Sequence, residues 1–134
     1  MKDNIIDKVA LICIVDKKVL TALSHSKSKL YLPGGKREIG ETDLECLKRE
    51  IYEELNVQIK QDSVQYFETF EAPADGKTDG ISVRMTCYFA DYSGNPEPSN
   101  EIVSLEWITY QDRDRTSAVV KIILDKLKAL KLIH

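Results

Sequence analysis

The sequence lacks any apolar run long enough to cross a membrane. Its longest uninterrupted apolar stretch is Val9–Val15, whereas a membrane-spanning helix needs about 20 residues. The first four residues, MKDN, also lack the basic flank and the apolar segment of a secretory signal. We therefore expect a protein with no membrane partner that resides in the cytoplasm.

Paired cysteines and an excess of basic charge are also absent. The three cysteines, Cys13, Cys46 and Cys87, are widely spaced and form no CxxC pair. This pattern is typical of buried thiols in a reducing compartment rather than of a disulfide framework or a thiolate zinc site. The formal net charge is −3, which argues against the basic stripe of a nucleic-acid coat protein. No nucleic-acid partner is expected.

What remains is the composition of one ordinary globular domain. The chain has 134 residues, of which 43% are hydrophobic and 31% are charged. Single hydrophobic cores typically serve chains of about 100–200 residues, and no repeat, low-complexity tract or long linker divides this one. We therefore predict a single domain over residues 1–134.

Segments rich in β-branched and aromatic residues predict strands. They are residues 8–15, 19–23, 30–32, 64–70, 81–89 and 102–110. A tight turn joins the first two segments, and turn-rich loops are expected at 75–80 and 93–99. Pro33-Gly34-Gly35 should form a shaped loop after the third, because proline cannot continue a strand ladder and glycine permits backbone angles closed to other residues.

Two segments show helical periodicity. Thr42-Asp43-Leu44-Glu45 has the form of a capping box, apolar residues then recur at helical spacing as far as Leu55, and Asn56 tolerates the left-handed conformation that follows a helix. A final helix is expected over 117–130, with Val120, Ile123, Leu127 and Leu130 on its buried stripe. A mixed sheet with a helix on each side would bury both stripes, so the pattern predicts an α/β layered sandwich.

Carboxylates are unusually dense in the first helix. Glu50, Glu53 and Glu54 fall within an arc of about 100° on a helix that turns about 100° per residue. Like charges so placed repel, and hard oxygen ligands suit Mg²⁺ or Mn²⁺, so a divalent cation among them is the favoured interpretation. Arg49 lies one turn before Glu53 and could orient its carboxylate. The alternative is a solvated acidic helix face.

These residues resemble the Nudix box, G-x5-E-x7-R-E-U-x-E-E-x-G-U, in which U is aliphatic. The matching residues are Gly35, Glu41, Arg49, Glu50, Ile51, Glu53, Glu54 and Val57. Asn56 replaces the second glycine, at a helix end where asparagine is the next best occupant. The chain is therefore similar to Nudix hydrolases of the MutT type, with the box over about residues 35–57.

The resemblance implies an α/β/α sandwich that hydrolyses a nucleoside diphosphate linked to a group X, giving a nucleoside monophosphate and phosphorylated X. It implies Mg²⁺ as the cofactor, with Mn²⁺ as a substitute. By the same resemblance the metal ligands are Glu50, Glu53, Glu54, Glu41 and the carbonyl of Gly35. Arg49 would orient Glu53, and the proton acceptor would be Glu53, Glu54 or a carboxylate from a distant loop, for which Glu101 is the candidate.

The box leaves the substrate open. A (d)NTP or an oxidised dNTP is the first expectation for a MutT-like chain, and nucleotide sugars and dinucleoside polyphosphates are alternatives. A regulatory module that binds a nucleotide without cleaving it is a further alternative, as is a homodimer. Lys27, Lys29, Lys36 and Arg37 flank the glycines and would either steer a polyanion toward them or serve as solubilising charge.

Overall fold

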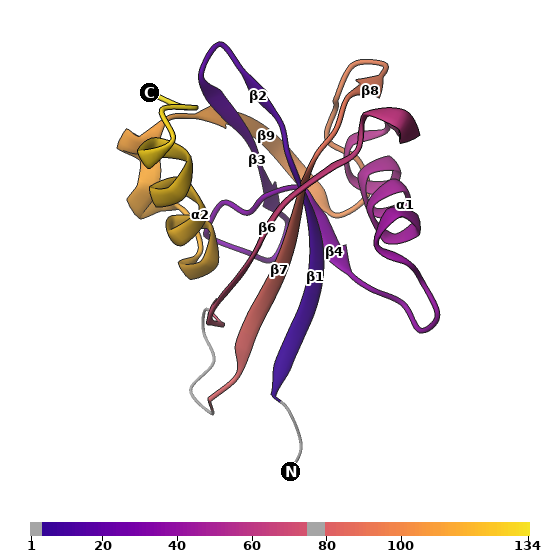
Figure 1. Cartoon of the computed structure of the whole chain (residues 1–134), viewed down its shortest axis with the longest axis horizontal. Coiled ribbons are helices and arrows are strands. Elements are labelled where there is room, and N and C mark those ends of the chain that lie inside the picture. The colour runs from indigo at the N-terminus through magenta and orange to yellow at the C-terminus, as the bar shows by residue number, and fades with distance from the viewer. Residues whose placement is uncertain (1–3, 75–79) are drawn as a thin grey trace.

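A computed structural model describes residues 4–74 and 80–134 of the chain (Figure 1). The elements are β1 Ile5–Ile12, β2 Ile14–Val15, β3 Lys18–Ser24, β4 Gly34–Lys36, α1 Asp43–Leu55, β5 Gln58–Ile59, a 3₁₀ turn Gln61–Ser63, β6 Gln65–Pro73, β7 Ser82–Phe89, β8 Tyr92–Ser93, β9 Ile102–Ile108, a 3₁₀ turn Tyr110–Arg115 and α2 Ala118–Ala129. Within these residues, no helix is long and apolar enough to span a membrane. The loop expected at 75–80 lies, apart from Gly80, outside the described residues.

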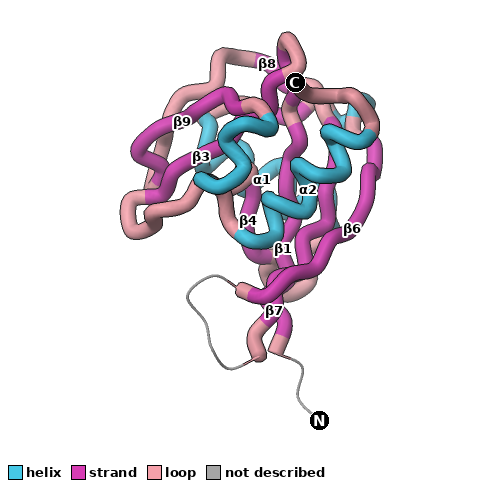
Figure 2. The backbone as a smooth tube through the Cα atoms, turned by 90° about the vertical axis from the view of Figure 1, so that its left-hand side faces the viewer, coloured by secondary structure: helices cyan, strands magenta, loops and turns pink. Residues whose placement is uncertain are grey.

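The strands form one mixed sheet and two smaller antiparallel sheets. The mixed sheet has the order β4-β1-β7-β6, with β1 parallel to β7 and the outer pairs antiparallel. The second sheet has the order β2-β3-β9, and β5 pairs with β8. Figure 1 shows α1 and α2 on opposite sides of the strands, and Figure 2 shows α2 crossing the face turned to the viewer. This arrangement confirms the α/β sandwich.

The alternation of side chains along β1 builds both cores. Val9 and Leu11 are fully buried against α1, whereas Ala10 and Ile12 are buried in the cluster that includes α2. Successive residues of a strand point to opposite faces, so a strand that is apolar at every position must lie between two layers. The continuous apolar run of the sequence therefore marks the central layer, which fixes the position of α1.

The first helix begins and ends as the sequence predicts. The Thr42 hydroxyl accepts the Glu45 N–H at 3.2 Å, and the Glu45 carboxylate accepts the Thr42 N–H at 2.9 Å, which completes the capping box. Asn56 ends the helix in the left-handed conformation, with φ of 57°. Its side-chain amide donates to the Glu97 carboxylate at 2.7 Å.

Two local expectations are wrong. Gly34 and Gly35 lie in strand β4, paired with Ala10 and Val9 of β1, and do not form a loop. Glycine is needed there because a Cβ at Gly34 would overlap the β1 backbone and Gly34 has φ of 146°. Leu130 does not lie on the buried stripe of the last helix. Helix α2 ends at Ala129, and the Leu130 side chain, which follows it, is 48% exposed.

Candidate functional site

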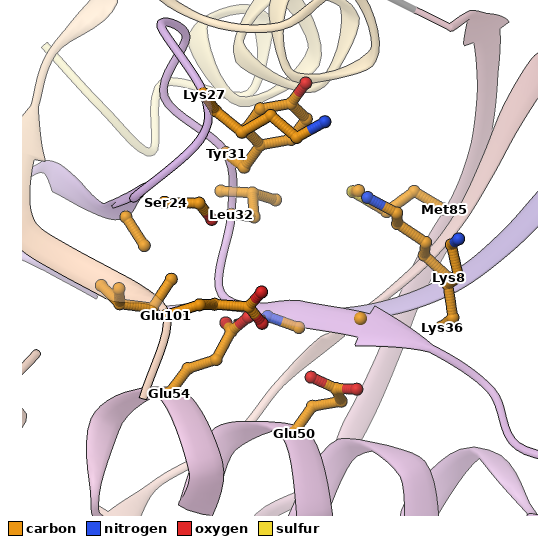
Figure 3. Close-up of a pocket in the computed structure, with 14 residues that line it drawn as sticks. Lys8, Ser24, Lys27, Tyr31, Leu32, Lys36, Glu50, Glu54, Met85 and Glu101 are labelled. Carbon is orange, nitrogen blue, oxygen red and sulfur yellow. Dashed lines mark hydrogen bonds between the residues drawn. The ribbon is translucent and has the colours of Figure 1, made fainter. Parts of the chain in front are cut away.

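Three residues of the box and the distant-loop candidate Glu101 lie at one cavity. The cavity has a volume of about 360 Å³ and lies between α1, β4, β1 and the chain segments beside β3 and β9. Gly35, Glu50, Glu54 and Glu101 line it. Figure 3 shows the carboxylates of Glu54 and Glu101 close together, with Glu50 next to them on α1. We call Glu50, Glu54 and Glu101 the acidic wall.

Main-chain hydrogen bonds bring Glu101 to α1 from almost fifty residues away. The N–H of Glu97 donates to the carbonyl of Leu55, and the N–H of Ser99 donates to the carbonyl of Glu54. These bonds dock the loop before β9 on carbonyls at the C-terminal end of α1, which have no partners within the helix. The carbonyl of Glu101 in turn accepts the N–H of His25 at 2.8 Å, which fixes the other side of the cavity.

Glu54 is the most deeply buried carboxylate of the site. Its residue is 7% exposed, and one carboxylate oxygen accepts the N–H of Gly34 at 3.0 Å. Burial raises the pKa of Glu54 to about 8, and the nearby charges of Glu50 and Glu101 add to the increase. A buried carboxylate of this kind is costly unless a cation accompanies it.

Glu50 depends on the absence of a side chain at Gly35. A Cβ at Gly35 would overlap the carboxyl group of Glu50, so this glycine makes room for the carboxylate beside β4. Burial raises the pKa of Glu50, although the Nη1 of Arg49 donates to it at 2.9 Å and opposes the increase. The Glu50 carboxylate is thus held close to the β4 backbone.

Arg49 forms hydrogen bonds with three carboxylates of the box, those of Glu41, Glu50 and Glu53. Its guanidinium donates to both oxygens of Glu41, at 2.6 and 2.9 Å, and holds the pKa of Glu41 down at about 2. The predicted contact with Glu53 exists, but at 3.4 Å it is longer than the bonds to Glu41 and Glu50. Glu53 is 43% exposed and does not line the cavity. Arg49 therefore positions Glu41 and Glu50 more firmly than Glu53.

The donor set suits a hard divalent cation, but its members are not gathered around one point. Among residues 4–74 and 80–134, no three His, Cys, Asp or Glu side chains are arranged to hold a metal ion, and Arg49 occupies oxygens of Glu41 and Glu50. The Gly35 carbonyl accepts the thiol of Cys46 at 3.7 Å. Glu54 is buried and Glu50 is partly buried. Within the described ranges Glu54 has no ion-pair partner and Glu50 has Arg49, and Gly35 leaves space beside Glu50. These two carboxylates nevertheless fit Mg²⁺ or Mn²⁺.

Lys8 also lines the cavity, and no sequence pattern singles it out. In the sequence it is one polar residue at the start of an apolar strand. In the sheet it is the register partner of Lys36, which follows the two glycines. The pairing of β1 with the glycine segment would have identified Lys8 as a cavity residue. That pairing joins segments far apart in the sequence, so a local pattern does not reveal it.

Comparison with known proteins places the chain in a family. The model of the NUDIX domain matches residues 6–125. The chain therefore belongs to the NUDIX family. It is a hydrolase of the class that acts on nucleoside diphosphates linked to another group, a class that generally requires divalent metal ions. No curated protein sequence matches it significantly.

Solved structures share the fold at low sequence identity. The ORF135 protein of E. coli superposes with a TM-score of 0.74 at 22% identity, over 96% of this chain and 92% of that one. A MutT NUDIX hydrolase from Burkholderia pseudomallei gives 0.76 at 18% identity, over 93% and 99%. A UDP-X diphosphatase gives 0.68 at 17% identity, over 96% of this chain and 62% of that one.

Proposed function

We propose that the chain hydrolyses a nucleoside diphosphate linked to a group X at the cavity beside α1, with Mg²⁺ or Mn²⁺. The observation that carries the proposal is the acidic wall, in which Glu50, Glu54 and Glu101 face one cavity beside Gly35 (Figure 3). A solvated helix face would leave its carboxylates exposed, whereas Glu54 is almost completely buried. Burial of this kind favours a bound cation over surface charge.

The residues of the box would share the work of holding the cation. Glu50 and Glu54, with Glu53 and Glu41 from the Arg49 cluster and the Gly35 carbonyl, supply oxygen donors of the kind that Mg²⁺ prefers. A bound divalent cation would offset phosphate charge and lower the pKa of a bound water. The guanidinium of Arg49 would keep Glu41 and Glu50 oriented as ligands.

A carboxylate of the chain must accept the proton of the attacking water. Glu101 and Glu54 both border the cavity, whereas Glu53 lies outside its lining. Glu101 is exposed to solvent and can exchange the proton with it. We therefore place Glu101 first as the proton acceptor, with Glu54 and Glu53 as the other choices.

The proposal is tested by Mg²⁺-dependent release of a nucleoside monophosphate from a panel of (d)NTPs, oxidised dNTPs, nucleotide sugars and dinucleoside polyphosphates. Glu50→Gln, Glu53→Gln and Glu101→Gln should each lower kcat by about tenfold or more. Glu71→Gln is the matched control, because Glu71 lies on β6 outside the cavity lining and, among the described residues, forms its ion pair with Arg84 at 3.5 Å. If a nucleotide binds the wild type and none is cleaved with either metal, the chain is a nucleotide-binding module instead.

The three thiols support a cytoplasmic location for this activity. Cys13, Cys46 and Cys87 are all free and buried, and buried reduced thiols are typical of a reducing compartment. Burial raises the pKa of Cys46 to about 11. Its thiol packs under β4 and donates to the carbonyls of Gly35 and Lys36, each at 3.7 Å.

A further inference from the structure

The cavity carries opposite charges on its two sides. The acidic wall comes from α1 and the loop before β9, whereas the ammonium groups of Lys8, Lys27 and Lys36 lie above and beside it (Figure 3). We call these three lysines the basic wall. Lys8 comes from β1, Lys36 from β4, and Lys27 from the loop after β3. Only Lys36 lies within the box.

The lysines of the basic wall repel one another. Lys8 and Lys36 are register partners on antiparallel strands, and like charges at such positions are destabilising. Burial lowers the pKa of Lys8, and the charges of Lys27 and Lys36 lower it further. In the described part of the chain, none of the three has a carboxylate within ion-pair distance, and the contact that Lys8 makes is with the ring of Tyr31, 5.2 Å from its centroid.

Neighbouring cations in the same segments have hydrogen-bond or ion-pair partners within the chain. Lys29 donates to the carbonyl of Asp114 at 3.3 Å, away from the cavity. Arg37 forms ion pairs with Asp7 and Asp43 on the α1 side of the sheet. Among the described residues, the three ammonium groups of the basic wall have neither a hydrogen-bond acceptor nor an ion-pair partner, unlike Lys29 and Arg37, which favours an anion from outside the chain as their partner.

Resting on the proposed function, we infer that the basic wall binds the phosphate chain of a substrate with three or more consecutive phosphates. A nucleotide sugar has two phosphates and about two negative charges, whereas a terminal phosphate adds about 1.5 to 2 more. A divalent cation in the acidic wall would neutralise the carboxylates that now attract Lys8. Three lysines would then face the substrate, and a polyphosphate matches that charge better than a diphosphate diester does.

The inference is tested with Lys8→Gln and Lys27→Gln, and Lys29→Gln is the matched control from the same loop as Lys27. The substrates are a nucleoside triphosphate, a dinucleoside tetraphosphate and a nucleotide sugar that share one base. For whichever polyphosphate the wild type cleaves, each cavity variant should raise KM about fivefold to tenfold, as expected for one lost charge-assisted contact. The nucleotide sugar and Lys29→Gln should change less than about twofold.

Two results would overturn the inference while leaving the proposed function intact. The first is an unchanged KM for polyphosphates in both cavity variants, and the second is a wild-type preference for the nucleotide sugar. If no nucleotide is cleaved, the proposed function fails, and calorimetric binding of inorganic tripolyphosphate to the same proteins decides the inference. Weaker binding by Lys27→Gln than by Lys29→Gln supports the basic wall, and equal binding by both refutes it.

Discussion

Replacing Glu54 with glutamine should stabilise the metal-free protein, and the gain should grow as the pH rises. Burial raises the pKa of Glu54 to about 8, from an ordinary value of 4.5. Between these values the folded protein keeps a proton that the unfolded chain has lost, so stability falls with rising pH. Since each pKa unit corresponds to about 1.4 kcal/mol, this carboxylate alone should cost about 2–3 kcal/mol between pH 5 and pH 7.

The glutamine variant removes this titration but keeps the local hydrogen bond, because the amide oxygen can still accept the Gly34 N–H. Urea unfolding in the presence of a chelator, repeated at several pH values, gives the difference in unfolding free energy between Glu54→Gln and the wild type. The difference should rise by about 2–3 kcal/mol from pH 5 to pH 7. A difference that does not change with pH would refute the assignment of an uncompensated buried carboxylate.

Mg²⁺ supplies the complementary measurement on the same two proteins. At pH 8 the wild type carries more negative charge at Glu54 than it does at pH 6, so added Mg²⁺ should raise its unfolding free energy more at the higher pH. The glutamine variant should show a smaller increase. An equal increase in both proteins would place the cation away from Glu54.

Four further substitutions probe the two glycines, the arginine and the end of α1. Gly34→Ala should lower stability by about 1–3 kcal/mol in urea unfolding, because a Cβ there meets the β1 backbone at a positive φ. Gly35→Ala displaces only the flexible end of Glu50, so it should lower kcat/KM about tenfold or more with a smaller loss of stability. Arg49→Lys should lower kcat/KM about tenfold to a hundredfold, because lysine lacks the fork that holds several carboxylates at once, and circular dichroism should show an intact fold. Asn56→Ala should lower the unfolding free energy by about 1–2 kcal/mol, since alanine resists the left-handed conformation.

The parts of the fold that sequence predicts well are those with local causes. The capping box of α1 involves Thr42 and Glu45, three residues apart, and the helix end at Asn56 follows from the conformational preference of one residue. The turn between β2 and β3 is similarly local, with Asp16 and Lys17 both at positive φ. Each of these features would be stable in almost any tertiary surrounding, so the sequence pattern is sufficient.

The parts that sequence misses depend on pairing between distant segments. Gly34 and Gly35 have the composition of a loop, and only their pairing with β1 makes them a strand. Lys8 has no distinguishing local pattern, because its role comes from the register of β1 with β4. Glu101 is a candidate in the sequence only through the family resemblance, and its place at the cavity comes from the docking of the loop before β9 on α1. Such contacts are set by tertiary packing, which a single sequence does not display.

The two walls of the cavity are therefore encoded in different ways. Most of the acidic wall comes from one helix with fixed spacing, so a short motif specifies Glu50 and Glu54 and with them the family's reaction. Two of the three lysines opposite come from β1 and from the loop after β3, outside that motif. If the basic wall selects the substrate, then a change at Lys8 or Lys27 alters which phosphates are bound while the acidic wall remains intact. Such a separation would let one fold and one motif serve chains with different substrates.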